Sequence, residues 1–425
     1  MEELTKYKLG EIAKIYNGST PSTLDASNYD GDIIWATPKD LSDQNSKYFS
    51  KGARNITQKG FDSCSTQMIP ANNILMSSRA PIGLFAINTI DCCTNQGFKN
   101  IVLDKAIADV DFMYYFLKYH VKEIEALGSG TTFREVSKTA FEKYEISIPS
   151  LPTQQKIASV LSKLDRKISV NREINRNLEE LAKQIYDYWF VQFDFPNKEG
   201  KPYKSSGGKM VYNEVLKREI PAGWEIKKIS SQIKENIGGD WGKEEPEGNY
   251  QLKVSCCRGA DLVSMTDLPT RYILNSNSYK LLEEDDMIVE ISGGSPTQAT
   301  GRCVLISKEI LNSFNNKLIC SNFCQALSIS DKDYVSYFYY MWKMFYNSDV
   351  FFNFEGKTSG IKNFQYDTFV AEKWYFPPKD LAKKFKEIVS QNYMKKCALD
   401  QENKHLAALR DELLPLLMNG QVKVN

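Results

Sequence analysis

The spacing of apolar residues along the chain alternates between a mixed pattern and a regular heptad pattern. From Thr153 to Phe190 there is neither proline nor glycine, and apolar or amide side chains recur in alternating steps of four and three. A second stretch, from Leu381 to Leu416, repeats these steps. Such steps are the a/d pattern of a coiled coil, so we expect two long helices. The predicted helix-pair seam consists of Ile157, Leu161, Leu164, Ile168, Leu178, Ile185, Leu381, Phe385, Ile388, Leu399, Leu406, Leu409 and Leu413.

Each predicted helix needs a partner for its apolar stripe, and the other long helix is the obvious one. A helix from Thr153 to Trp189 would span roughly 55 Å at ~1.5 Å per residue. Asparagines in both seams (Asn171, Asn175 and Asn392) would fix the register at some cost in stability. We therefore expect the two helices to pair within the chain, and to be antiparallel if the two domains lie at opposite ends. The alternatives are that they bind the helices of another protein or lie partly exposed.

The segments that precede the two heptad stretches repeat each other in order. The paired segments are Tyr7–Ile12 and Trp224–Ile229, Ile33–Leu41 and Leu252–Leu262, Asp111–Leu117 and Asp333–Tyr339, Gly128–Phe133 and Gly356–Ile361, and Glu145–Pro149 and Lys373–Pro377. Strands, an aromatic-rich helix and a loop of small residues therefore follow one another twice. Two copies of one mixed α/β domain are the simplest explanation, although any two α/β domains share some of this order.

The expected fold class is α+β: two similar mixed α/β domains separated by two long antiparallel coiled-coil helices, with a pseudo-two-fold internal repeat. We expect the first domain over residues 1–150, the first long helix over 151–195 and the second domain over 223–376. The second long helix is expected over 377–425. Proline and glycine punctuate residues 196–222, which are therefore expected to form a connector.

The composition is globular, and the charges nearly cancel. Lys and Arg number 54 against 53 Asp and Glu, so only a local basic face would bind nucleic acid. No apolar run suits a signal peptide or a membrane span. Nine cysteines without a Cys-x-x-Cys pair, and only two histidines, indicate reduced thiols and no zinc site. We therefore expect a cytoplasmic protein without membrane contact.

Catalytic motifs are missing from the sequence. There is no glycine-rich ATP loop, and the one double proline, Pro377-Pro378, lacks the neighbours of a methyltransferase loop. Asp194 with Glu199–Lys201, and Glu355–Lys357, resemble a Mg²⁺-dependent nuclease pattern, but such loose spacing is common by chance. We expect no catalytic residue, metal ligand or cofactor in this chain. The alternatives are a stand-alone nuclease or methyltransferase and a coiled-coil scaffold.

The connector and the helix ends resemble one known family. The residues that carry the resemblance are Asp194–Pro196, Gly200–Lys204, Ser206–Met210, Ile220–Trp224, Leu151–Ala158 and Leu409–Gly420. Together with the order of domain, helix, domain and helix, they are similar to the specificity subunits of Type I restriction-modification enzymes. The segment Pro377–Leu381 departs from the helix start seen at Leu151–Ala158, which leaves the start of the second helix open.

The resemblance implies a double-stranded DNA target, with each domain reading one half of a split, asymmetric sequence and the helices setting the spacer. It also implies two modification subunits, which use S-adenosylmethionine to methylate adenine. Two restriction subunits, which use ATP and Mg²⁺ to translocate and cleave DNA, are the remaining partners that it implies.

Base reading requires polar or basic side chains on loops that can enter a groove. The candidates are Thr20, Ser22, Lys39, Arg54, Arg79, Thr131, Thr132, Phe133 and Arg134 in the first domain and Lys243, Arg258, Gln298, Arg302, Lys357, Thr358, Ser359 and Lys362 in the second. The two equivalent loops, 128–134 and 356–362, are the strongest candidates because small residues permit close approach to phosphate. For any single cation, a solvated surface charge is the alternative.

Overall fold

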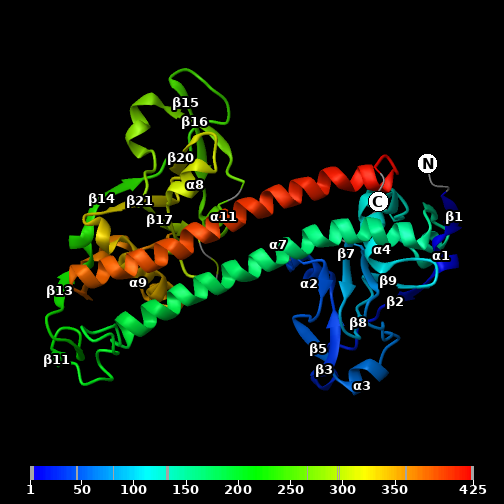
Figure 1. The fold of residues 1–425 in the computed structure, drawn as a ribbon, viewed down its shortest axis with the longest axis horizontal. Helices are drawn as coiled ribbons and strands as arrows, with labels where there is room; N and C mark the ends of the chain where they lie inside the picture. The colour runs from blue at the N-terminus through cyan, green and yellow to red at the C-terminus, as the bar shows by residue number, and fades with distance from the viewer. Residues whose placement is uncertain are drawn as a thin grey trace. The chain divides into compact units, whose positions relative to one another are not determined.

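The computed structural model describes residues 4–44, 46–79, 81–130, 134–265, 267–293, 295, 297–358 and 361–422, without the side chains of 357 and 358. The chain forms two compact units (Figure 1). The first unit contains Met1–Asn171 and Glu402–Asn425, and the second contains Arg172–Gln401. The expected α+β class, with two similar domains and two long helices, is confirmed.

The first unit is built on a five-stranded sheet in the order β2-β9-β6-β7-β4 and a three-stranded sheet in the order β5-β3-β8. Every residue of the central strand β6 is buried, which explains its continuous run of uncharged residues. The strands are β1 (Thr5–Lys8), β2 (Ala13–Asn17), β3 (Tyr29–Ala36), β4 (Tyr48–Phe49), β5 (Arg54–Ile56), β6 (Ile74–Ser78), β7 (Ile82–Asn88), β8 (Cys93–Thr94), β9 (Phe98–Leu103) and β10 (Glu145–Ile148). The short helices are α1 (Leu9–Ile12), α2 (Pro38–Asp43), α3 (Gln58–Asp62), α4 (Val110–Tyr119), α5 (Val121–Ala126) and α6 (Lys138–Glu142).

The second unit repeats the order of four of the five strands of the larger sheet, as β14-β21-β17-β19, and the order of the three-stranded sheet, as β16-β15-β20. The antiparallel pair β13–β24 likewise repeats β1–β10. The strands are β11 (Met210–Asn213), β12 (Arg218–Pro221), β13 (Glu225–Lys228), β14 (Ile233–Gly238), β15 (Tyr250–Cys257), β16 (Thr270–Leu274), β17 (Met287–Glu290), β18 (Ser292–Gly293), β19 (Cys303–Leu305), β20 (Lys317–Cys320), β21 (Cys324–Ile329), β22 (Glu355–Thr358), β23 (Ile361–Phe364) and β24 (Lys373–Phe376). The short helices are α8 (Lys308–Asn312), α9 (Val335–Asn347) and α10 (Tyr366–Ala371). The shared strand orders explain the sequence repeat as a duplicated domain.

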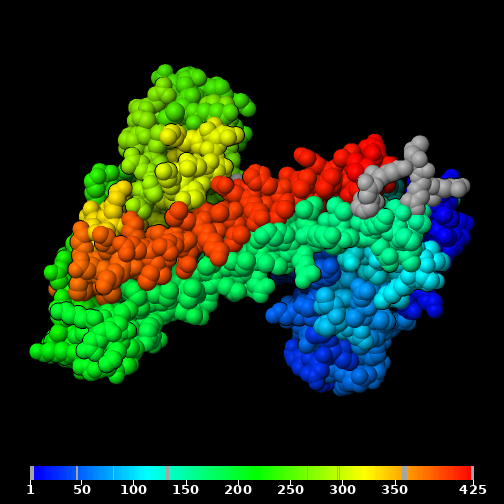
Figure 2. Space-filling model, viewed as in Figure 1, coloured from blue at the N-terminus to red at the C-terminus, as the bar shows by residue number. Residues whose placement is uncertain are grey.

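Two long helices, α7 (Leu151–Tyr186) and α11 (Lys379–Met418), pack against each other within each unit (Figure 2). In the first unit the amide of Asn171 donates to Glu402 at 2.7 Å, and residues 165 and 410 form an ion pair. In the second unit the amide of Asn175 donates to Asp400 at 2.6 Å, and residues 179 and 396 form an ion pair. In both units the residue numbers of the contacting positions rise along α7 as they fall along α11, so the two helices are antiparallel.

Over part of α11, the seam lies one residue later in the chain than the apolar pattern predicted. Ile388 and Leu409 are exposed by 37% and 44%, so their assignment to the seam is wrong. Val389, at 4% exposure, and Arg410, which pairs with α7, occupy the adjacent positions instead. The prediction failed there because much of the contacting face of α11 is polar, and the spacing of apolar residues gives no information on polar contacts.

The other predicted seam residues are shielded from solvent at least in part. Five of them are buried: Ile157, Leu161, Ile168, Leu381 and Phe385. The rest are half-buried: Leu164, Leu178, Ile185, Leu399, Leu406 and Leu413. Within the described residues, no helix is long and apolar enough to cross a membrane.

Candidate nucleic-acid interface

In each unit four chain segments meet at one edge of the two sheets, and we call this edge the rim. The rim of the first unit consists of residues 18–20 after β2, 37–40 after β3, 79 after β6, and 95–97 before β9. The rim of the second unit consists of residues 239–241 after β14, 258–261 after β15, 292 after β17, and 321–323 before β21. Most of the segments are loops on a rigid frame, which is where binding residues commonly lie.

Two glycines anchor the rims in the same way. A Cβ on Gly18 would lie 2.0 Å from the carbonyl oxygen of Asn95, and a Cβ on Gly239 would lie 2.0 Å from that of Ser321. Real Cβ atoms do not approach an oxygen so closely, so both positions require glycine. The residue after each glycine donates its backbone N–H to the opposite segment: Ser19 to the carbonyl of Thr94 and Asp240 to that of Cys320, both at 2.9 Å.

Further backbone contacts match between the rims. Asp40 accepts from the N–H of Thr37 at 2.7 Å, as Asp261 accepts from that of Arg258 at 2.8 Å. The carbonyl of residue 97 accepts from residue 78 at 2.7 Å, as that of 323 accepts from 291 at 2.9 Å. Besides Gly18 and Gly239, and Asp40 and Asp261, these contacts make five further pairs of positions equivalent: Thr20 and Trp241, Thr37 and Arg258, Arg79 and Ser292, Gln96 and Asn322, and Gly97 and Phe323.

The rim of the first unit carries cations without carboxylate partners. Lys39 is exposed and Arg79 is half-buried, and neither forms an ion pair with any part of the chain that the structure describes. The hydroxyl of Thr20 donates to the side-chain carbonyl of Gln96. Beside the rim, the buried Lys99 pairs with Glu135 at 2.9 Å. Unpaired cations next to amide and hydroxyl groups suit contacts with phosphates and base edges.

The rim of the second unit and its surroundings pair their cations internally. Arg258 forms two hydrogen bonds of 2.8 Å with Asp261, which raise the pKa of the guanidinium. Arg302 is held by the buried Glu290 at 2.6 and 2.9 Å, which likewise raises its pKa. Lys362 lies 2.8 Å from a carboxylate oxygen of residue 355. Three predicted DNA-binding residues are therefore already engaged by carboxylates.

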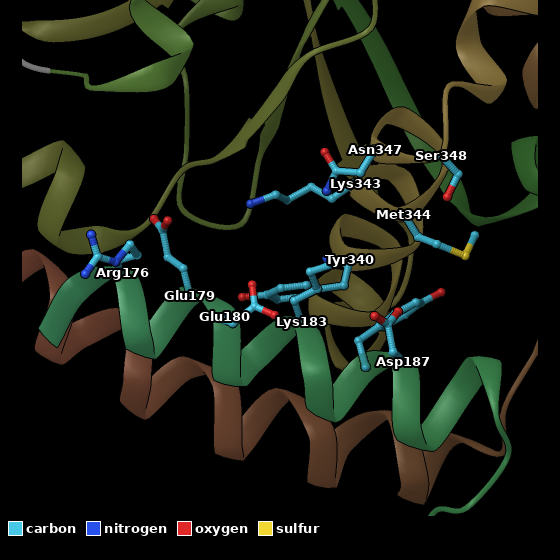
Figure 3. Close-up of a pocket in the computed structure, with 11 residues that line it drawn as sticks. Arg176, Glu179, Glu180, Lys183, Asp187, Tyr340, Lys343, Met344, Asn347 and Ser348 are labelled. Carbon is cyan, nitrogen blue, oxygen red and sulfur yellow. The ribbon is translucent and has the colours of Figure 1, made fainter. Parts of the chain in front are cut away.

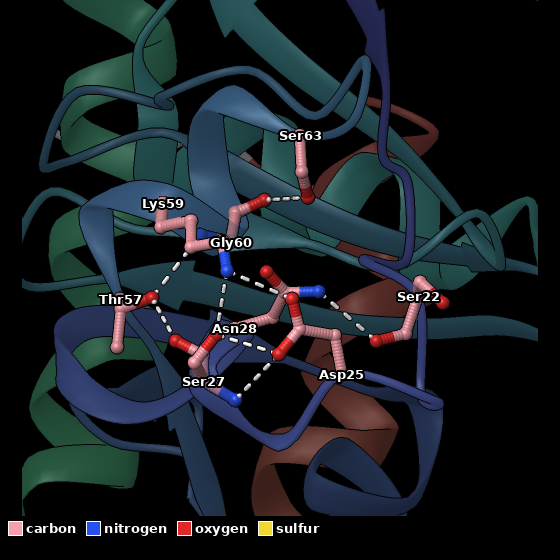
Figure 4. A network of polar contacts seen from close by, with 8 residues as sticks. All are labelled: Ser22, Asp25, Ser27, Asn28, Thr57, Lys59, Gly60 and Ser63. Carbon is pink, nitrogen blue, oxygen red and sulfur yellow. Dashed lines mark hydrogen bonds and ion pairs between the residues drawn. The ribbon is translucent and has the colours of Figure 1, made fainter.

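A polar network holds the loop that bears the predicted residue Ser22 (Figure 4). The carbonyl of Ser22 accepts from the amide of Asn28 at 3.1 Å, and Asp25 accepts from the backbone and side chain of Ser27. Lys59 on α3 pairs with Asp25 at 2.8 Å. Hydrogen bonds from Lys59 and Ser27 lower the pKa of Asp25 to about 2. The loop is therefore tied to α3.

The remaining predicted residues have separate surroundings. Arg54 lies 3.8 Å above the ring of Tyr29 and pairs with Asp30 at 3.4 Å, whereas Lys243 pairs with Glu247 at 3.6 Å. Arg134 donates to the backbone carbonyls of Gly128 and of Glu125 in α5, and Gln298 is exposed. The predicted residues Thr131, Thr132, Phe133 and Ser359, and the side chains of Lys357 and Thr358, lie outside the described residues.

Sequence reasoning missed seven of the ten residues in these equivalent pairs: Thr37, Gln96, Gly97, Trp241, Ser292, Asn322 and Phe323. One signal was present, because the matched pairs Asp40-Leu41 and Asp261-Leu262 place Thr37 opposite the candidate Arg258. The turns at 96–97 and 322–323 share no residue type and gave no such signal.

The second unit also has a cavity of about 430 Å³ between α7 and α9 (Figure 3). Its walls carry three cations and three carboxylates: Arg176, Lys183, Lys343, Glu179, Glu180 and Asp187. Burial raises the pKa of Asp187. Because these charges cancel, the cavity has no excess positive charge to attract a polyanion. Among the described residues, no group of three or more His, Cys, Asp or Glu side chains could hold a metal ion.

Comparison with known proteins identifies the family. Residues 1–180 match the Type I restriction modification DNA specificity domain. The Type I restriction enzyme MjaIX specificity subunit of Methanocaldococcus jannaschii is 30% identical over 98% of this chain and 93% of its own length. The EcoR124I/EcoR124II specificity subunit of Escherichia coli is 28% identical over 45% of this chain and 48% of its own. The crystal structure of a Type I S subunit from M. genitalium, 18% identical, shares the fold over 98% of this chain and 96% of its own, with a TM-score of 0.58.

These similarities support neither a stand-alone nuclease nor a coiled-coil scaffold. They also agree with the duplicated domains and the paired long helices. The chain therefore belongs to the DNA-specificity subunits of Type I restriction-modification enzymes, which are non-catalytic components.

Proposed function

We propose that each unit uses its rim to read one half of a bipartite, asymmetric sequence in double-stranded DNA. One observation carries the proposal: the rims share their backbone hydrogen bonds, their anchoring glycines and the aspartates at 40 and 261, but differ in side chain at the five other pairs of positions named above. Backbone frames position a reader on DNA, and side chains at base edges specify the sequence. Because the two rims share a backbone frame but carry different side chains, we expect them to read two half-sites of different sequence.

The partners and cofactors belong to the same proposal. Two modification subunits bind the helices and carry S-adenosylmethionine for adenine methylation, and two restriction subunits add ATP- and Mg²⁺-dependent cleavage. The helical faces provide room for such partners, because many charged side chains of α7 and α11 stay exposed. The cavity between α7 and α9 offers cations and carboxylates for polar contacts with a partner.

Methylome sequencing tests the reading of DNA. A methylation-free host receives this chain and its neighbouring modification subunit, and we expect a split motif with adenine methylated in both halves. Exchanging residues 7–149 for the first domain of another specificity subunit should then change one half of the motif and leave the other. A folded complex that methylates no split motif contradicts the proposal.

A second experiment tests whether the helix pair sets the spacer. Asn171 and Asn175 face residues 402 and 400, so residues 168–174 of α7 lie opposite roughly 400–406 of α11. Removing one heptad from both helices keeps the seam in phase and shortens the pair by about 10 Å. We expect a gap about 3 base pairs shorter between unchanged half-sites, since base pairs rise by about 3.4 Å. An unchanged gap refutes a spacer role of the helices.

A further inference from the structure

We propose that Phe323 is a specificity-determining residue that contacts the methyl group of a thymine in the half-site of the second unit. The inference rests on the proposed function of the rims and adds the chemistry of one contact. Phe323 stands at the tip of the turn between β20 and β21, and 49% of its surface is exposed. It is equivalent to Gly97 of the first unit.

The two units fill the space around this position in opposite ways. A Cβ on Gly97 would lie 3.0 Å from Cγ of Pro38 and 3.6 Å from Nε of Arg79, so neighbouring side chains cover the glycine. The equivalents of those neighbours in the second unit are Gly259 and a serine at position 292. Large residues stand beside the glycine of the first rim, whereas a glycine and a serine stand at the equivalent positions of the second rim, which carries a phenylalanine instead. The bulky side chain at this point of the rim is therefore Phe323 in the second unit and Arg79 in the first.

The turn holds Phe323 firmly in this exposed place. Its carbonyl accepts from the N–H groups of Ile291 at 2.9 Å and Ser292 at 3.2 Å. The N–H of Cys324 closes the turn on the carbonyl of Ser321 at 2.9 Å, and Gly239 packs against the same residue. A rigid backbone fixes where the ring is presented, which reduces the entropy lost when the ring meets a ligand.

A phenyl ring has no hydrogen-bonding group, which narrows what it can recognise on DNA. In the major groove the thymine C5-methyl is the apolar feature that distinguishes one base pair from another, and phenylalanine is a known contact for it. The nearby Arg258 and Arg302 are held by carboxylates and do not compete for the same base edge. The second rim is thus suited to apolar reading at the position where the first rim offers a guanidinium.

Deoxyuridine, which lacks the C5-methyl group, tests the contact directly. The complex of this chain with its modification subunit is titrated with duplexes in which each thymine of the second half-site is replaced in turn. The wild-type complex should bind one of the uracil duplexes about fourfold more weakly than the thymine duplex, because this is the contribution of one buried methyl group. Phe323→Ala should bind the thymine and uracil duplexes equally. Tyr212→Ala, which removes an aromatic that is 54% exposed on β11, should keep the wild-type preference.

Three outcomes overturn the assignment: a wild type that tolerates uracil at every position, a Phe323→Ala variant that still discriminates at the same thymine, or a second half-site without thymine. Phe323→Gly, which installs the residue of the first unit, provides a second variant if alanine disturbs the turn. Failure of the proposed function is distinguishable, because the complex would then methylate no split motif at all.

Discussion

The rims of the two units share a frame and differ in how their charges are balanced. In the first rim, Lys39 and Arg79 have no ion-pair partner within the described chain. In the second rim, Arg258 is paired with Asp261. Beside the rims both units pair cations with carboxylates: Lys99 in the first unit, and Arg302 and Lys362 in the second. Phosphate affinity comes from free cations. A near-neutral chain can therefore concentrate electrostatic attraction in one unit and leave the other to recognise DNA by shape and apolar contact.

The largest expected effect comes from removing the buried carboxylate of the second unit. Glu290, whose side chain is 3% exposed, neutralises Arg302, which is 17% exposed. Glu290→Gln leaves a largely buried cation unpaired and should cost about 3 kcal/mol of unfolding free energy. Urea unfolding followed by tryptophan fluorescence measures this loss, because every tryptophan except Trp35 lies in the second unit.

Glu247→Gln is the matched control in the same unit. Glu247 is 72% exposed and pairs with Lys243, which is 51% exposed. Loss of so exposed a pair should change the free energy of unfolding by less than about 1 kcal/mol. Equal effects of the two substitutions would show that burial does not distinguish the ion pairs of this unit.

The anchoring glycines test whether the frames are truly equivalent. Gly18→Ala and Gly239→Ala each force a methyl group against a carbonyl oxygen and should destabilise their own unit by about 2 kcal/mol. Each should weaken recognition of one half-site only, as measured by methylation of duplexes with single half-site changes. Gly238→Ala is the control, because its Cβ would meet no atom within 4 Å. Unequal effects of the two substitutions would show that the two backbone frames are not equivalent.

A smaller effect is expected from single cations at the two rims. Lys39→Ala removes an unpaired charge. The negative slope of log affinity against log salt should become less steep by about 0.9, the value for one phosphate contact. Lys362→Ala removes a charge that Glu355 already neutralises and should leave the slope unchanged. Salt titrations of the assembled complex measure both slopes. A less steep slope for Lys362→Ala would mean that the ion pair between Lys362 and Glu355 opens when the protein binds DNA.

The smallest effect concerns the loop beside the first rim. The folded-state pKa of Asp25 is lowered to about 2 from 3.8, so its charged form stabilises the loop above pH 3.8. This contribution is lost as the pH falls from 3.8 through about 2. Amide exchange at Ser27 should therefore show the same protection between pH 8 and pH 5, after correction for intrinsic rates. Asp25→Asn should lose protection throughout that range, and unchanged protection would contradict the role of Asp25.

The architecture was predictable because it rests on patterns that repeat. Heptad steps located both long helices, and the order of strand-like segments located the duplicated domain. The exact seam of α11 was not predictable from apolar spacing, since Asp165 and Arg410 meet across 245 residues of chain. A polar contact of that kind leaves no periodic signal near either residue.

The candidate site was less predictable than the fold. A sequence shows that Arg302 is cationic, but not that Glu290 from a neighbouring strand neutralises it. It also gives no sign that Gly97 and Phe323 are equivalent, because matching backbone contacts and not matching residues establish the pair. Side-chain chemistry was visible in the sequence, whereas the pairing and exposure that decide its use depend on the folded chain.

The packing of residues 402–422 with the first unit has a consequence for how the protein is made. Arg410 lies 245 residues after Asp165, so a ribosome adding 5–20 residues per second delivers it roughly 12–50 s later. During that interval the part of α7 that faces the late segment, including Leu161, lacks its partner helix. The part of α7 in the nascent first unit therefore remains uncovered by its partner helix until residues 402–422 have been synthesised.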